Sequence, residues 1–187
     1  AVGERIAAVL AASSDGPSLT YCYEGDLDYT GHRHGVDSSE WLMQLVAVDA
    51  MCEQLRDTLP PSVRLVIVAD HGMVDSPTDN RLDIDSVPSL RRSVSLVGGE
   101  ARFRHLYCRD GAAADVAEAW REVLGERAVV LERDEAISRG WFGAVADRVN
   151  ARLGDVMVAC TGDFALISSV DFTYEHRMIG MHGSMTA

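Results

Sequence analysis

The feature that most constrains the fold is the run VRLVIVA at residues 63–69, in which every residue except Arg64 is apolar. Such runs are typical of strands in a parallel sheet, because helices cover both faces of the sheet. A helical repeat precedes the run, with apolar residues at Trp41, Leu42, Leu45, Val48, Cys52 and Leu55. Before it, the alternating segment SLTYCYE at 18–24 predicts another strand. Strand, helix and strand in this order predict a βαβ unit with a right-handed crossover.

The rest of the chain predicts a second structural region. Residues 76–90 are polar and contain prolines, which indicates a linker or loop. Residues 90–145 then predict a hairpin turning at Gly98-Gly99, a helix around 116–123, the strand AVVLE and a short helix at DEAISRGWF. The later segments DVMVAC and FALISSV predict strands that rejoin the main sheet or pair with each other. We therefore expect an α/β fold with a core at 1–80, an α+β cap insertion at 81–150 and a return to the core at 151–187.

Composition and charge exclude some classes of function. The net charge of −12 argues against general nucleic-acid binding, which needs a basic face. Bound metal cations would still allow a small phosphate substrate, because they reverse the local field. A run of about 18 apolar residues is absent, so we expect no membrane span.

The first residues, AVGERIAAVLAASSDGP, predict a short amphipathic helix and lack the basic start of a signal peptide. We expect a soluble protein, with a cytoplasmic location favoured. The chain does not begin with Met, so upstream targeting information would lie outside it.

The four cysteines, Cys22, Cys52, Cys108 and Cys160, show no CxxC pairing. Zinc-finger and thioredoxin patterns are therefore excluded. Each cysteine lies in an apolar stretch, which predicts a small buried hydrophobic side chain.

Carboxylate and imidazole groups follow three of the predicted strands. They occur in Asp28-Tyr29-Thr30-Gly31-His32, in Asp70-His71-Gly72-Met73 and in Met181-His182-Gly183-Ser184. In open α/β sheets, ligands bind outside the carboxyl ends of the strands. With the βαβ unit, the sequence therefore predicts that the first two of these segments lie side by side at that edge.

These side chains suit a metal ion. Carboxylate oxygen and neutral imidazole nitrogen are the usual non-thiolate ligands of catalytic zinc. Asp28 and His32 are four residues apart, so one helical turn or a tight loop lets both face one ion. Asp70 and His71 are adjacent and can share an ion only if the chain turns, as Gly72 permits. Each segment alone also fits a structural role, such as an Asp that caps a turn or helix or a solvated loop His. His34 could line the site, whereas His105 and His176 are expected at the surface.

Together these segments resemble the type I phosphodiesterases/nucleotide pyrophosphatases of the alkaline phosphatase superfamily. The matching text is YEGDLDYTGHRHGVDSSEW, LVIVADHGMVD and GMHGS. The resemblance covers roughly residues 18–76 and 153–187, and the cap region between them carries nothing that can be assigned. It implies an alkaline-phosphatase-like sheet with flanking helices, of which this chain is the C-terminal portion.

The resemblance also implies a two-zinc site. By it, Asp28, His32 and His182 are the ligands of one Zn²⁺, and Asp70 and His71 are two ligands of the second. The family completes the second site with an earlier Asp and a Thr or Ser nucleophile, which we expect upstream of this chain.

By the same resemblance, the parent enzyme hydrolyses phosphodiester or pyrophosphate bonds of a small phosphate ester or nucleotide. This portion alone is expected to be inactive, because Ser18 and Thr20 fall in a predicted strand and neither is expected to be the nucleophile. Its partner would be the missing N-terminal portion of the same protein. The alternatives are a phosphomonoesterase or phosphonate hydrolase of the same superfamily, or a non-catalytic metal-binding module.

Overall fold

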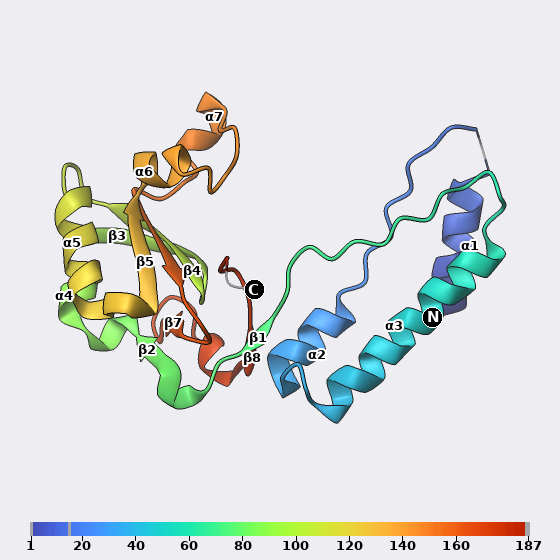
Figure 1. Ribbon diagram of the computed structural model, residues 1–187, viewed down its shortest axis with the longest axis horizontal. Coiled ribbons are helices and arrows are strands. Elements are labelled where there is room, and N and C mark those ends of the chain that lie inside the picture. Colours follow the sequence, from blue (N-terminus) through green and yellow to red (C-terminus); the bar gives the residue numbers. More distant parts are fainter. Residues whose placement is uncertain (1, 15, 186–187) are drawn as a thin grey trace. The chain divides into compact units, whose positions relative to one another are not determined.

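The computed structural model describes residues 2–14 and 16–185 and divides the chain into two compact units. The N-terminal unit is Ala1–Asp70 and the C-terminal unit is His71–Ala187. Both contribute to a mixed α/β architecture, but all assigned strands lie in the C-terminal unit (Figure 1). The expected boundaries at 80 and 150 do not coincide with these units, and the three-part division stays a prediction for a complete domain.

The N-terminal unit contains three helices, α1 (Val2–Ala12), α2 (Asp26–His34) and α3 (Ser39–Thr58). The helices predicted at the first residues and at 41–55 are confirmed as α1 and α3. The Ser38 hydroxyl caps α3 by accepting a hydrogen bond from the Trp41 amide at 3.1 Å. Ile6 of α1 packs with Met51 and Leu55 of α3 in a small core.

The two strands expected in the N-terminal unit are not formed. Residues 18–24 and 63–69 are extended but pair with no strand among the described residues, so the predicted βαβ unit is wrong for this structure. A parallel strand is stabilised by hydrogen bonds to neighbouring strands, and the described chain supplies none for these segments. Cys22 is exposed for the same reason, contrary to expectation, whereas Cys160 is buried.

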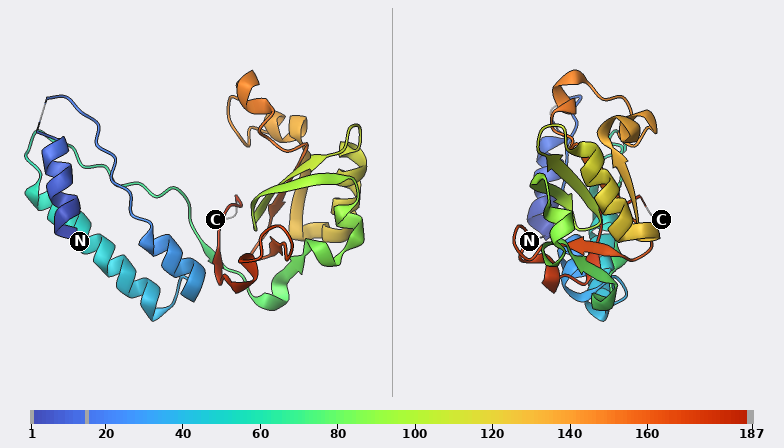
Figure 2. Two further views of the ribbon diagram at one scale, coloured as in Figure 1. Left: turned by 180° about the vertical axis from the view of Figure 1, so that it is seen from behind. Right: turned by 90° about the vertical axis from the view of Figure 1, so that its left-hand side faces the viewer.

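The C-terminal unit is built on an antiparallel sheet with the strand order β3-β4-β6-β5. Its strands are β3 (Val94–Glu100), β4 (Phe103–Cys108), β5 (Ala128–Glu132) and β6 (Val156–Cys160). The strands β3 and β4 form the expected hairpin (Figure 2), but it turns at Ala101-Arg102 rather than at the glycines. Gly99 lies within β3 at φ +81°, where a Cβ would meet the Phe103 carbonyl oxygen.

Helices cover both faces of this sheet. On one face, α4 (Pro88–Arg91) and α5 (Ala113–Leu124) pack through Leu90, Val116 and Trp120. On the other face, α6 (Arg133–Ser138) packs against Met157, and α7 (Asp147–Asn150) follows it. Alternate residues of β6 therefore enter two cores, which explains why all five of its residues are buried.

The segment expected to be a linker is folded into the C-terminal unit. Within 74–91 lie β1 (Val74–Asp75), η1 (Thr78–Asn80), β2 (Arg81–Asp83), η2 (Ile84–Ser86) and α4. Ile84 and Leu90 are fully buried, and the Trp120 indole donates a hydrogen bond to the Leu90 carbonyl at 3.0 Å. The apolar residues in this polar segment, rather than its average composition, determine its place in the core.

Two short strand pairs complete the C-terminal unit. β2 pairs in parallel with β7 (Ala165–Ile167), and β1 pairs antiparallel with β8 (Gly180–Met181). The short helices η3 (Gly125–Arg127) and η4 (Glu175–Arg177) lie in connecting segments. None of the described helices has the length and apolar character needed to cross a membrane.

Candidate metal centre

Helix α2 brings together the first two candidate ligands. Asp28 and His32 lie four residues apart on one face of the helix, with 3.3 Å between His32 Nε2 and Asp28 Oδ2. The helix begins with two acidic residues and ends with basic ones, which favours it because of the helix dipole. This segment therefore forms a helical turn rather than a tight loop. The helix places the Asp28 carboxylate beside the His32 imidazole.

In the C-terminal unit, the β1–β8 pair brings together two candidates that are distant in sequence. Val74 lies opposite Met181 and Asp75 opposite Gly180. Because the strands are antiparallel, His71 before β1 and His182 after β8 lie at the same end of the strand pair. Their rings stack, with centroids 3.7 Å apart and 19° between the planes. Two imidazoles 111 positions apart in the sequence thus meet within one unit.

The His71 ring has a defined hydrogen bond. Its Nδ1 lies 3.0 Å from the Gly72 carbonyl oxygen, which can only accept, so Nδ1 carries the proton. A hydrogen bond of this kind orients metal-binding histidines in proteins, and Nε2 is the ring atom that would bind a metal. The backbone of the predicted Asp-His-Gly turn therefore selects the tautomer of His71.

The loop that carries His182 is fixed at three points. Met181 is held by the β1–β8 pair, and the Ser184 hydroxyl donates a hydrogen bond to the Cys160 carbonyl. Gly183 has φ +109°, and a Cβ there would lie 2.7 Å from Glu100 Cβ. Only glycine fits this close approach, so the tip of the β3–β4 hairpin supports the loop of His182.

A buried ion pair fixes the segment that leads to β8. Arg104 of β4 is fully buried and donates to the Glu175 carboxylate and, at 3.1 Å from Nε, to the Leu166 carbonyl. Glu175 also accepts from the Ser168 amide at 3.1 Å. Burial raises the pKa of the Glu175 carboxyl, while the Arg104 guanidinium acts in the opposite direction. The pair joins β4, β7 and the chain approaching His182.

Sequence reasoning missed this support. Arg102 in the hairpin turn and Arg104 of β4 flank Phe103, a pattern that predicts a solvated face, yet both arginines are buried. Their guanidinium groups are satisfied by backbone carbonyls that sequence does not reveal, such as Phe164 O, 2.8 Å from Arg102 Nη1. The alternation itself was the available signal that two cations share one face.

Asp70 and the other histidines differ in exposure. Asp70 is exposed and is the last residue of the N-terminal unit. His34 and His176 are exposed. His105, expected at the surface, is half-buried and its Nδ1 accepts a hydrogen bond from the Gly154 amide at 3.2 Å. Burial lowers the pKa of His105, and its hydrogen bond joins β4 to the segment that precedes β6.

The donor set fits zinc in its chemistry. Two imidazoles in the C-terminal unit and a carboxylate-imidazole pair on α2 are nitrogen and oxygen donors of the kind found in catalytic zinc sites. The assignment of Asp28, His32 and His182 to one ion spans the two units and stays a prediction. So does the assignment of Asp70 and His71 to a second ion.

The motifs that carry these ligands match a known protein family. A sequence model described as type I phosphodiesterase/nucleotide pyrophosphatase matches residues 2–185. The chain belongs to this family, as the motifs indicated. No curated protein matches it closely enough to add to this finding.

Several solved structures resemble the chain in fold. Murine ectonucleotide pyrophosphatase/phosphodiesterase 5 has a TM-score of 0.77 at 19% identity, with 98% of this chain and 48% of that one covered. The human protein of the same name has a TM-score of 0.74 at 20% identity and the same coverage. Phosphonoacetate hydrolase from Sinorhizobium meliloti 1021 has a TM-score of 0.56 at 19% identity, covering 84% and 41%. The chain thus spans about half the length of the ectonucleotide relatives it matches.

Proposed function

We propose that this chain supplies ligands to the two-zinc centre of a phosphodiesterase/nucleotide pyrophosphatase. The observation that carries the proposal is the stacking of His71 on His182, since these are the histidines of two separate family motifs. Asp28, His32 and His182 bind one zinc, and Asp70 and His71 bind the other.

Backbone and side-chain groups of this chain orient the two histidines that would bind the metal. The hydrogen bond between His71 Nδ1 and the Gly72 carbonyl would leave Nε2 as the ring atom that binds the zinc. The Gly183 and Ser184 contacts hold His182 in place. Zinc, when bound, supplies Lewis acidity to a phosphoryl oxygen and lowers the pKa of a coordinated hydroxyl or water.

The hydroxyl that attacks the phosphorus does not come from any of the residues of this chain that match a family motif. The Ser18 hydroxyl donates to the Ala12 carbonyl at 3.3 Å in an extended segment, and the Ser184 hydroxyl is engaged by Cys160 O. Thr20 lies exposed in the same extended segment. The 187 residues alone therefore have negligible turnover, and the nucleophile comes from the part of the domain that its relatives possess in addition.

The substrate is a phosphodiester or pyrophosphate, such as a nucleotide. This rests on the family match and on a structure of an inactive variant of the murine relative, which holds AMP. A phosphonate or a phosphate monoester is the second candidate, favoured by the fold shared with the bacterial phosphonoacetate hydrolase. A panel of bis(p-nitrophenyl) phosphate, p-nitrophenyl phosphate and phosphonoacetate, assayed on the full-length gene product, separates these substrate classes. A non-catalytic metal-binding module would turn over none of them.

Zinc titration of the purified chain tests the ligands without relying on activity. We expect His182→Ala to lower the affinity for zinc by at least roughly 10–100-fold. That is the usual effect of removing a group that only hydrogen-bonds to a metal ligand. His176→Ala is the matched control, because His176 is an exposed histidine of the same unit and has no assigned role. Equal zinc binding by both variants would contradict the proposed ligand set.

A further inference from the structure

Helix α2 carries two of the proposed zinc ligands, but packing anchors it only weakly. Of its nine residues only Gly31 is buried. None of its side chains belongs to the small core that joins α1 to α3. A helix of this length is marginally stable by itself, because starting a helix costs more than its few hydrogen bonds return. The positions of Asp28 and His32 therefore depend on the contacts at the ends of α2.

A side chain that precedes α2 caps its beginning. The first amides of a helix have no partner within the helix itself. Gly25 occupies the N-cap position and has no side chain to accept hydrogen bonds from them. The Glu24 carboxylate takes this role, since its Oε1 accepts a hydrogen bond from the Asp26 amide at 2.8 Å. The helix dipole also favours a negative charge at this end.

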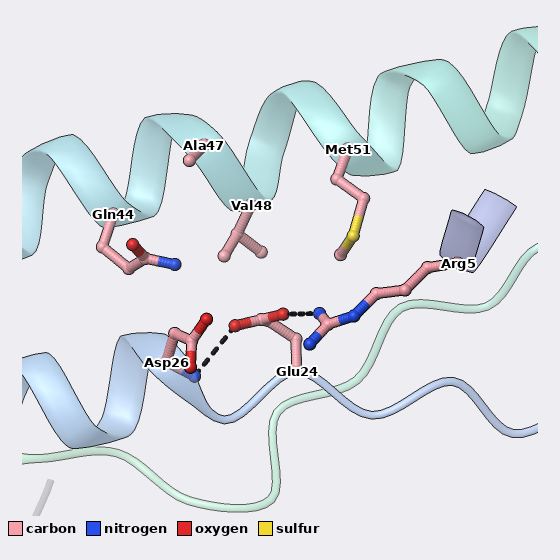
Figure 3. A pocket seen from close by; sticks show the side chains of 7 residues that line it. All are labelled: Arg5, Glu24, Asp26, Gln44, Ala47, Val48 and Met51. Carbon is pink, nitrogen blue, oxygen red and sulfur yellow. Dashed lines mark hydrogen bonds and ion pairs between the residues drawn. The ribbon is translucent and has the colours of Figure 1, made fainter. Parts of the chain in front are cut away.

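Arg5 of α1 holds the same carboxylate. Its guanidinium donates a hydrogen bond to Glu24 Oε2, whereas Oε1 accepts from the helix. The two oxygens of one carboxylate thus join α1 to the first turn of α2 (Figure 3). The Glu24 side chain is only 13% exposed, so water competes little for these contacts. Hydrogen bonds between charged groups are also stronger than those between neutral ones.

The positive charge of Arg5 matters because carboxylates gather at this end of α2. Glu24 is followed by Asp26 and Asp28, the two acidic residues of the first turn. Like charges this close repel one another. Such repulsion would move Glu24 away from the amide that it caps, and the Arg5 guanidinium offsets it.

Packing against α3 does not replace this contact. A cavity of about 260 Å³ separates the Glu24 carboxylate from α3, where Gln44, Val48 and Met51 line it (Figure 3). Atoms that line a cavity lack the attractive contacts that close packing supplies. The ion pair of Arg5 and Glu24 therefore carries the attachment of the first turn on this side.

We propose that Glu24 and Arg5 position the zinc ligands of α2. Arg5 holds Glu24, and Glu24 fixes the first helical turn. That turn contains Asp28, and His32 follows one turn later. The 3.3 Å contact between Asp28 Oδ2 and His32 Nε2 exists only while both turns stay helical. The inference rests on the proposed function for its metal, and neither Glu24 nor Arg5 is a proposed ligand.

Zinc titration of the purified chain tests the positioning role. Glu24→Ala should lower the affinity for zinc roughly 2–30-fold, the equivalent of losing one helix cap. Glu24→Gln keeps an acceptor oxygen for the Asp26 amide and should recover part of that loss. Arg5→Ala removes the ion pair alone, so its effect should stay within about fivefold. Glu53→Ala is the matched control, because Glu53 pairs with Arg56 in the same unit and lies outside the cavity lining.

Amide hydrogen exchange, measured by NMR on the metal-free chain, separates positioning from general stability. In Glu24→Ala, the amides of α2 should exchange roughly 2–30-fold faster, whereas those of α3 keep their rates. A general loss of stability would raise the exchange of α3 as well and would contradict a local role. Equal exchange of α2 in Glu24→Ala and Glu53→Ala would overturn the inference.

A ligand variant separates failure of the inference from failure of the proposed function. His32→Ala should lower the affinity for zinc more than any of the variants above. If His32→Ala binds zinc as tightly as Glu53→Ala does, the ligand set is wrong and the inference falls with it. If His32→Ala weakens zinc binding and Glu24→Ala does not, only the positioning role is refuted. Weaker zinc binding together with faster exchange in α2 supports both.

Discussion

Substituting Gly183 by alanine should displace the loop of His182. A residue other than glycine at φ +109° costs about 1–3 kcal/mol in backbone strain. The new Cβ would also lie 2.7 Å from Glu100 Cβ, which is not the flexible end of a side chain, and such overpacking costs about 1–3 kcal/mol more. The sum is roughly 2–6 kcal/mol, comparable with the contribution of the few contacts that hold this loop.

The loop should therefore detach rather than the whole unit unfold. We expect Gly183→Ala to weaken zinc binding roughly 10–100-fold, measured by competition titration, with a drop of only a few degrees in melting temperature. Gly140→Ala is the control for strain alone, because Gly140 has φ +78° and open space around its Cβ position. Glu100→Gly, added to Gly183→Ala, removes the clashing Cβ and should restore part of the zinc affinity. If Gly183→Ala binds zinc as the unmodified chain does, the hairpin tip does not position His182.

The other predictions concern the C-terminal unit and the thiols. Glu175→Gln should destabilise the chain by about 3–5 kcal/mol in urea unfolding, because it leaves the buried Arg104 without its counter-charge; a change below 1 kcal/mol would contradict this. The pKa of His105 is lowered by burial, so the stability it contributes is present above the ordinary value of 6.5 and is lost as the pH falls through the folded-state pKa. His105→Asn should therefore flatten the acid side of the stability curve, and an unchanged curve would exclude this histidine as its source. Burial raises the pKa of Cys160 to about 12, whereas Cys22 is exposed, so iodoacetamide at pH 8 should label Cys22 well before Cys160. Labelling at equal rates, read by mass spectrometry, would show that the sheet opens readily.

Local patterns predicted the local elements. The apolar stripe at 116–123 became α5, and AVVLE became β5, because amphipathic periodicity is a property of consecutive residues. The hairpin at 94–108 was also predicted, although its turn lies two residues beyond the glycines. Pairing between distant segments is not contained in such patterns. For this reason the placement of β6 between β4 and β5 was not predicted, and the strands expected at 18–24 and 63–69 have no partner among the described residues.

The candidate site was likewise predicted where it depends on local spacing and not where it depends on pairing between distant segments. Residue types and spacing identified Asp28 and His32 as a pair, and the helix confirms that both lie on one face. The approach of His71 to His182 depends on two-residue strands that are too short to be recognised by periodicity. The Gly183 contact is with Glu100 at the hairpin tip, 83 positions earlier in the sequence, so only the folded structure reveals what supports the histidine.

The position of β6 also determines when the C-terminal unit can form during synthesis. β3, β4 and β5 are complete once residue 132 has been made, yet β4 and β5 are joined only through β6, which ends at Cys160. Until that point the nascent chain exposes a hairpin and a lone strand whose open edges can pair with other chains. Long-range pairing of this kind slows folding, because the closing strand must return to a gap left by earlier ones. A nascent chain from which β5 has emerged and β6 has not would therefore have a sheet open at its centre, with two edges accessible to chaperones or to aggregation.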